Sequence, residues 1–243
     1  NSPSTRRKFK CFKLMNIEIA IKIMYENPNE IGTDKLSSKG EYKDDMQEGE
    51  WFIYHEVGKL ESKGKYKNDR KDGEWISYYY FGGQIYSKGK YKDGKREGEW
   101  VYNYDSGDLW FKNDFKNDKE EGPWVYYWIS GGVESKGNFK NGKKEGPWIY
   151  YWMDGKSEKK KGNYKNSMEE GEWVSYHNNG QLHCKSNYEN GNLEGLFQCQ
   201  NENGQLMWKG NYKDGKENGL WHHYKEDGSL EKTVIWKNGV KQE

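Results

Sequence analysis

The sequence predicts an all-β fold, an elongated single-layer antiparallel array of β-hairpins made of about eight units of 24 or 25 residues. One large aromatic residue returns at that interval, which marks a repeat architecture. Each unit also holds two turn signals around two short runs of aromatic and β-branched residues, as expected for strands joined by reversals. Finally, the chain is polar, with 33% charged residues, yet 16% of its residues are aromatic and 30 are Gly. Periodic aromatic residues therefore order a chain that could not build a thick core. The repeating residues are Trp51, Trp75, Trp100, Trp124, Trp148, Trp173, Phe197 and Trp221.

Each unit reads Lys-Gly-x-Tyr-Lys, a first turn, Glu-Gly-x-Trp-x-x-Tyr, and a second turn that carries Gly. We expect the first turn to be a four-residue loop and the second a two-residue loop. Each Gly then lies between two Trp residues, and a neighbouring ring compensates for the missing side chain of a strand glycine. The predicted pairs are Lys67 with Asp72, Tyr66 with Gly73, Gly64 with Trp75, Gly64 with Trp51, and Tyr66 with Gly49.

The same register places lysines opposite carboxylates across the first turns. Such cross-strand ion pairs contribute only about 0.2–1 kcal/mol each, so they select the register more than they stabilise it. The predicted pairs join Lys43, Lys67, Lys92, Lys116, Lys140 and Lys165 to Glu48, Asp72, Glu97, Glu121, Glu145 and Glu170.

Because side chains alternate between faces along a strand, the register also sorts the residues by face. One face carries the Trp residues and the Gly-x-Tyr tyrosines. The other alternates aliphatic residues with lysines, such as Ile76 beside Lys63 and Lys88. Two units are one residue longer, between Gly64 and Gly89 and between Gly137 and Gly162, which predicts a bulge or a longer turn in each.

The ends divide the chain into three parts. Residues 1–15 carry five basic residues and are predicted to be a basic N-terminal arm. Residues 16–36 alternate Ile with other residues from Ile17 to Ile23, which predicts a capping strand before a half repeat; strand addition to a partner is the other interpretation. Residues 37–243 form the array, which ends in a half repeat.

Composition narrows the classes of function. Forty basic and 39 acidic residues leave a net charge of +1, so no overall field favours nucleic acid. No apolar run reaches the length of a membrane span, although a leader before Asn1 remains compatible with the sequence. No nucleophile elbow, phosphate loop or metalloprotease motif is present. We therefore predict no catalytic residues, no cofactor and no metal, and consider the chain not to be an enzyme.

One cluster resembles a metal site, namely His177, His183, Cys184 and Cys199. In the predicted register Cys184 lies opposite Cys199 on the Trp-bearing face, whereas His183 points to the other face. The four side chains cannot meet one ion, so a cross-strand pair of thiols is favoured over zinc or a disulfide.

The repeated strings resemble the MORN-variant repeat, as in Gly89-Lys-Tyr-Lys-Asp-Gly-Lys-Arg-Glu-Gly-Glu-Trp100. The resemblance covers about residues 39–239. It implies a β-hairpin array with a role in protein–protein contact or assembly. Repeats of this type occur in ciliates, in large DNA viruses and in bacterial proteins that are labelled antitoxin components. The seventh unit departs most from the pattern, with Ser186, Glu189, Phe197 and Gln200; the fourth has Asn113 for Gly.

The predicted function is a structural scaffold that binds other protein subunits through its extended aromatic face, without nucleic acid. A peripheral membrane or polyanion-binding role is the first alternative, and an antitoxin-like or secreted binding protein is the second. Self-association through the sheet edges is also possible in such an array. An intracellular site or a large assembly (organelle, cilium or virion) is favoured over secretion. The candidate partner-binding residues are Trp51, Tyr66, Trp75, Tyr91, Trp100, Trp124, Trp148, Trp173, Phe197 and Trp221.

Overall fold

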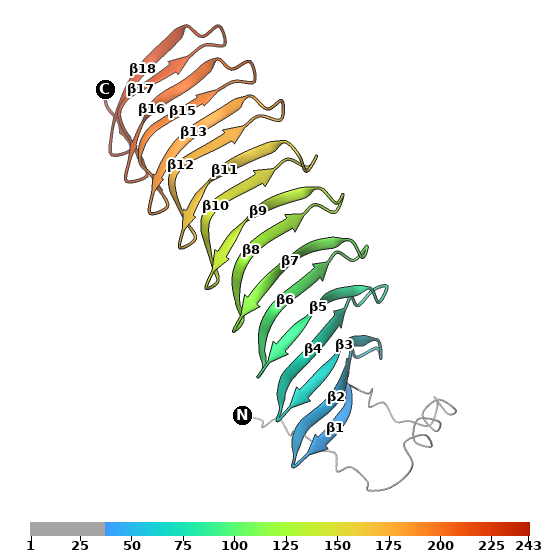
Figure 1. Cartoon of the computed structure of the whole chain (residues 1–243). Coiled ribbons are helices and arrows are strands. Elements are labelled where there is room, and N and C mark those ends of the chain that lie inside the picture. The colour runs from blue at the N-terminus through green and yellow to red at the C-terminus, as the bar shows by residue number, and fades with distance from the viewer. Residues whose placement is uncertain (1–36) are drawn as a thin grey trace, which may run out of the picture. The chain divides into compact units, whose positions relative to one another are not determined.

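Two reversals in each repeat fold the chain into consecutive antiparallel strands that all belong to one sheet. The computed structural model describes residues 37–243. Interior strands pair with the strand before and the strand after, except that the short β14 pairs only with β13, which also pairs with β15. Figure 1 shows the hairpins following one another in chain order. The predicted all-β hairpin array is confirmed. The predictions for residues 1–15 and 16–36 lie outside the described residues.

The strands alternate between the two halves of the repeat. They are β1 (Ser38–Lys43), β2 (Met46–Tyr54), β3 (Leu60–Lys67), β4 (Arg70–Tyr78), β5 (Ile85–Lys92), β6 (Lys95–Asn103), β7 (Leu109–Lys116), β8 (Lys119–Tyr127), β9 (Val133–Lys140), β10 (Lys143–Tyr151), β11 (Glu158–Lys165), β12 (Met168–Tyr176), β13 (Leu182–Glu189), β14 (Asn192–Leu193), β15 (Gly195–Gln200), β16 (Leu206–Lys213), β17 (Lys216–Tyr224), β18 (Leu230–Lys237) and β19 (Val240–Lys241).

The first turns are tighter than predicted. Lys67 pairs with Arg70, so the loop contains only Asn68 and Asp69, whose φ angles of 48° and 63° suit a type I′ hairpin turn. The predicted pairing of Gly64 with Trp75 is nevertheless correct. The two-residue turn and the pairing of Gly64 with Trp75 are compatible because β4 contains a bulge between the turn and Trp75, which restores the register. The predicted pairs of Lys67 with Asp72 and of Tyr66 with Gly73 are wrong.

The tighter turn also removes the predicted ladder of ion pairs. Cations now face cations across several first turns, as Lys92 faces Lys95 and Lys140 faces Lys143. The carboxylates instead accept hydrogen bonds from the turn of the following unit. Glu145 Oε2, for example, accepts from the N–H of Asn166 at 2.9 Å. The same contact recurs at Glu48, Glu97, Glu121, Glu170 and Glu194.

The second turns are one residue longer than predicted. The N–H of His55 donates to the carbonyl of Lys59, which leaves a three-residue loop that ends at Gly58 with φ of 81°. A register shift beside the turn absorbs the extra residue, so Gly64 pairs with Trp51 and Tyr66 with Gly49, as predicted. In the two longer units the loop has four residues, closed by Tyr79 and Gln84 in one and by Trp152 and Ser157 in the other. The longer turn, one of the two predicted alternatives, is therefore correct.

The core is a row of indole rings lying on glycines. A Cβ added to Gly64 would lie 2.3 Å from the ring of Trp75, so only glycine admits this contact. The same relation joins Gly40, Gly89, Gly137, Gly162 and Gly210 to the Trp eleven residues later. Most of these rings also donate their Nε1 hydrogen to a backbone carbonyl, as Trp75 does to Lys65 at 2.9 Å. The predicted contact between Trp and Gly thus forms the main packing unit of the sheet.

Candidate interaction surface

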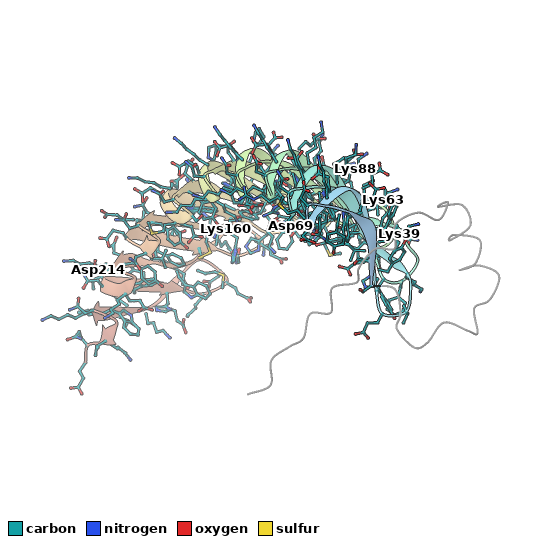
Figure 2. All side chains as sticks on the ribbon, turned by 90° about the horizontal axis from the view of Figure 1, so that it is seen from below. Lys39, Lys63, Asp69, Lys88, Lys160 and Asp214 are labelled. Carbon is teal, nitrogen blue, oxygen red and sulfur yellow. A yellow bond between two sulfur atoms is a disulfide. The ribbon has the colours of Figure 1, made fainter. Side chains whose placement is uncertain are left out.

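The sheet has two chemically different faces. The Trp face carries the Trp residues, the Gly-x-Tyr aromatic residues and the neighbouring tyrosines. The Lys face carries one row in which aliphatic residues alternate with lysines, since Ile76 pairs with both Lys63 and Lys88. In Figure 2 the sheet is curved, with Lys39, Lys63 and Lys88 on its outer side and Lys160 on its inner side. The inner side of the curve is the Trp face, because the Lys160 ammonium lies 4.3 Å from the Trp173 ring centre.

The structure changes the role expected of the tryptophans in the candidate face. Seven of them are between 1% and 6% exposed, because each ring lies over a glycine, or over Asn113 in the case of Trp124, and is flanked by the tyrosine or phenylalanine rings of the adjacent strands. Trp75, for example, makes edge contacts with Tyr66 and Tyr91 at 5.1 and 6.2 Å. These indoles hold the sheet together and offer almost no surface. Tyr66, Tyr91 and Phe197 of the predicted set are half-buried and remain partly accessible.

Basic side chains that the sequence reasoning did not select lie over these rings. Lys71 Nζ is 4.1 Å from the ring centre of Trp75, and Lys144 Nζ is 4.3 Å from that of Trp148. Arg96 occupies the same position in its unit and stacks on Phe115 at 3.8 Å. Burial lowers the pKa of Lys71 and of Lys144. The sequence contains a signal for these cations, since Lys71, Arg96 and Lys144 are each the second residue after a first turn. Their position on the Trp face follows only from the two-residue turn of the structure.

Two of these cations bind tyrosine hydroxyls at equivalent positions. Arg96 donates to Tyr102 Oη at 3.2 Å, and Lys144 donates to Tyr150 Oη at 2.8 Å. Tyr150 Oη also lies 3.2 Å from the hydroxyl of Tyr164. Burial raises the pKa of Tyr102 and of Tyr150, so both stay neutral near pH 7. These hydroxyls can therefore give or accept hydrogen bonds beside a fixed positive charge.

The seventh unit holds a covalent link. Cys184 lies opposite Cys199, as predicted, but the two sulfurs form a disulfide between β13 and β15, with a Cα–Cα distance of 4.1 Å. The preference for free thiols is therefore corrected, because directly opposed residues bring their Cβ atoms within bonding reach. His183 packs against His177 with ring centres 4.4 Å apart. Burial, together with the charge of His177, lowers the pKa of His183.

Two shallow hollows lie at the edges of the described sheet. The one of about 340 Å³ lies between first turns and is lined by Arg70, Lys92, Asp93, Lys95, Glu97 and Asn117. Another, of about 320 Å³, lies beside second turns and is lined by Asn201, Glu202, Asn203, Met207, Tyr224 and Glu226. Residues 37–243 contain no group of three or more His, Cys, Asp or Glu side chains arranged to hold a metal ion. Over the same residues, no helix is long and apolar enough to cross a membrane.

Comparison with protein families gives three matches to the MORN repeat variant, at residues 47–68, 96–117 and 169–190. They cover the hairpins β2–β3, β6–β7 and β12–β13, and each match begins just after a first turn and ends at the next one. A comparison with curated proteins found no significant match. The matched segments are whole units of the array, separated by other units with the same two-residue first turns. Trp75 and Trp148 in the intervening units make the same contact with Gly. The chain is thus a MORN-variant repeat protein.

Proposed function

We propose that the chain is a non-enzymatic scaffold that binds another protein along its Trp face. The observation that carries this proposal is the set of three cations held on buried aromatic rings, namely Lys71 on Trp75, Arg96 on Phe115 and Lys144 on Trp148. A scaffold binds its partners through an extended surface, and a repeat array supplies such a surface without an enclosed site. Tyrosine and arginine are also residue types that concentrate binding energy at protein interfaces.

The accessible chemistry of this face favours a partner with carboxylate side chains. Lys71 and Lys144 make no ion pair within residues 37–243, whereas Arg96 pairs with Asp118 at 3.2 Å. A partner carboxylate reaching Lys144 would also reach the hydroxyl of Tyr150, which is 2.8 Å from Nζ. The seven buried tryptophans would then hold the side chains of the Trp face in position, and the cations and tyrosines packed against them would contact the partner.

The test is affinity purification of the tagged full chain from its native source. The Trp-face variant combines Lys71→Glu and Lys144→Glu. The Lys-face variant combines Lys63→Glu and Lys136→Glu and carries the same change of net charge. We expect one or more stoichiometric proteins to bind the wild type and the Lys-face variant but to be lost with the Trp-face variant. Circular dichroism must first show that both variants fold. Loss with both variants, or no bound protein with the wild type, contradicts the proposal.

A second candidate, binding to an anionic surface, is favoured by the corrected register. Four of the six lysines that were expected to face carboxylates face other cations, as in the pairs Lys92 with Lys95 and Lys116 with Lys119. The other two, Lys43 and Lys165, face Met46 and Met168. Like charges directly opposite each other are unfavourable in a sheet. They repeat along one edge every second strand, about 9.6 Å apart. Anionic groups bound along that edge would relieve the repulsion.

Vesicle flotation separates the two candidates. If this edge binds membranes, the chain floats with phosphatidylserine-containing vesicles at low salt and less at physiological salt, and it does not float with phosphatidylcholine alone. Lys119→Glu combined with Lys143→Glu abolishes flotation, whereas the Trp-face variant keeps it. Absence of flotation at low salt removes this candidate and leaves the scaffold proposal intact.

A further inference from the structure

The ring contacts of the Trp face are interrupted at one place in the array. From Tyr42 to Tyr188, contacts between aromatic rings link every strand to the next, and the last of them joins Trp173 to Tyr188 with centres 6.4 Å apart. The series resumes at Phe197, which contacts Tyr212 at 5.4 Å. Within residues 37–243, no ring contact crosses from β13 to β15, although these strands are paired neighbours in the sheet (Figure 1).

The sequence of the seventh unit explains the interruption. Ser186 stands where most units have Gly, and Phe197 stands where the others have Trp. At the equivalent Gly162, an added Cβ would lie only 2.2 Å from the Trp173 ring, so a serine leaves no room for a ring in the usual place. Phe197 instead contacts Trp221 on its C-terminal side, with centres 5.8 Å apart.

The backbone is also less regular at this junction. The strand that follows the first turn is divided at Glu194 into β14 and β15, whereas the corresponding strands β2, β4, β6, β8, β10, β12 and β17 are each continuous. β13 pairs with β14 through Tyr188 and Glu189, and with β15 through Cys184 and Lys185. The junction between β13 and β15 therefore lacks both the ring packing and the unbroken strand of the other units.

A covalent bond lies where the ring contact is missing. Cys184 and Cys199 are each two residues from the Ser186 and Phe197 positions, so they share a face with them, and their disulfide joins β13 to β15. The same pair of positions holds Ser62 with Ser77 in one unit and Phe111 with Tyr126 in another. Within residues 37–243, the link is specific to the unit that lacks the contact between Trp and Gly.

We propose that the Cys184–Cys199 disulfide is a redox-sensitive switch that controls bending of the array between β13 and β15. While the bond is intact, it takes the place of the missing ring contact. After reduction the junction keeps hydrogen bonds, such as that from the Glu194 N–H to the Asn187 carbonyl at 2.8 Å, but no packed ring. Residues 37–189 and 192–243 then change their relative orientation about this junction. The switch does not rest on the scaffold proposal, because Lys71, Arg96 and Lys144 all precede it.

The reaction is thiol–disulfide exchange with a small dithiol. Cys184 is half-buried and Cys199 is 1% exposed, so the thiolate of the reductant attacks Cys184 Sγ and Cys199 leaves as a thiolate. The second thiol of the reductant then attacks the mixed disulfide, which releases Cys184 and closes a cyclic disulfide in the reductant. Two electrons and two protons pass from the dithiol to the chain, and an oxidised dithiol reverses the reaction.

The first test is small-angle X-ray scattering of the full chain carrying Cys11→Ser, so that only one disulfide can form within it. We expect reduction with dithiothreitol to broaden the distribution of interatomic distances and to shift the maximum dimension, and reoxidation to restore the first curve. Circular dichroism is measured on the same samples and should retain the sheet signal. Identical scattering before and after reduction overturns the proposal. Loss of the sheet signal on reduction also overturns it, because the disulfide would then hold the fold and not one junction.

The second test rebuilds the missing contact without sulfur. Cys184→Ser with Cys199→Ser should scatter like the reduced chain. Adding Ser186→Gly with Phe197→Trp to that variant restores the contact between Trp and Gly, so its curve should return to that of the oxidised chain and no longer respond to dithiothreitol. The matched control adds Asn187→Gly with Gln198→Trp, which introduces the same residue types one position away, on the Lys face. If the rebuilt contact fails to restore the curve, or if the control restores it equally, the proposal is wrong.

Discussion

Trp124 differs from the other core tryptophans in the residue beneath its ring. The fourth unit has Asn113 where other units have Gly, and Asn113 is only 4% exposed. Its Nδ2 donates to the carbonyl of Asp114 at 3.2 Å, which is the carbonyl that the Trp124 indole would otherwise reach. Trp124 Nε1 and Asn113 Oδ1 are consequently buried without hydrogen-bond partners. The Trp124 ring instead stacks on Phe111, with centres 5.1 Å apart and planes at 19°.

Restoring glycine at this position is predicted to stabilise the sheet. Asn113→Gly removes the unsatisfied Asn113 Oδ1 and frees the Asp114 carbonyl for Trp124 Nε1. An unsatisfied buried polar atom costs about 1–3 kcal/mol, whereas glycine in a strand costs about 0.5–1 kcal/mol. We expect the free energy of unfolding to rise by about 1 kcal/mol and Tm by about 2–4 °C, measured by thermal unfolding. The reciprocal change Gly137→Asn, which places a side chain against the Trp148 ring, lowers Tm. A lower Tm for Asn113→Gly contradicts this account.

The length of the first turn determines which side chains lie on each face of the sheet. A two-residue first turn followed by a bulge places Lys71, Arg96 and Lys144 on the Trp face and frees the neighbouring carboxylates for the next turn. The same bulge accommodates Pro123 and Pro147, which have no partner on the preceding strand. A proline in that position loses no ladder hydrogen bond. The two-residue first turn and the bulge that follows it therefore determine the register, the polarity of both faces and the contact between units.

The disulfide between β13 and β15 is predicted to stabilise the seventh unit, which departs most from the repeat pattern. That unit lacks the Trp and Gly pair of its neighbours, having Phe197 and Ser186 instead. A link across a separation of 15 residues stabilises by about 3 kcal/mol through the unfolded chain. We expect reduction, or Cys184→Ser with Cys199→Ser, to lower the unfolding midpoint and to increase amide exchange in β13–β15. The check is hydrogen exchange by mass spectrometry with and without reductant. Peptide maps that recover both cysteines unlinked under non-reducing conditions would rule out the link.

Contacts between units determine how the whole array behaves. The main contacts join strands adjacent in the chain, and the carboxylate of one unit binds the turn of the next. Stability in such an array is close to a sum of unit and neighbour contributions. The side chains of the second turns can therefore differ from one stretch of the array to another without changing the topology.

Removal of one complete unit is predicted to leave the fold intact. Deleting residues 119–142 joins Asp118 to Lys143 and keeps a first turn between two complementary strands. We expect the far-ultraviolet spectrum to remain that of a sheet, with a lower Tm. Deleting residues 119–130 removes one strand and brings two strands of the same type together, so the array misfolds or aggregates. Equal solubility and cooperativity of the two deletions would contradict a repeat-based register.

The sequence by itself determined the repeat, the strand alternation, the opposition of Cys184 and Cys199, and the contact between Trp and Gly, because these follow from periodicity and from the size of an indole ring. Only the tertiary structure decided the turn lengths, the bulge that reconciles them, the partners of the carboxylates and the burial of the tryptophans. A loop shorter by two residues can be compensated by two residues in a strand, so the same pairing of Gly64 with Trp75 is compatible with both turns. Which side chains stay accessible depends on how the whole sheet curves, and a one-dimensional pattern does not record that curvature.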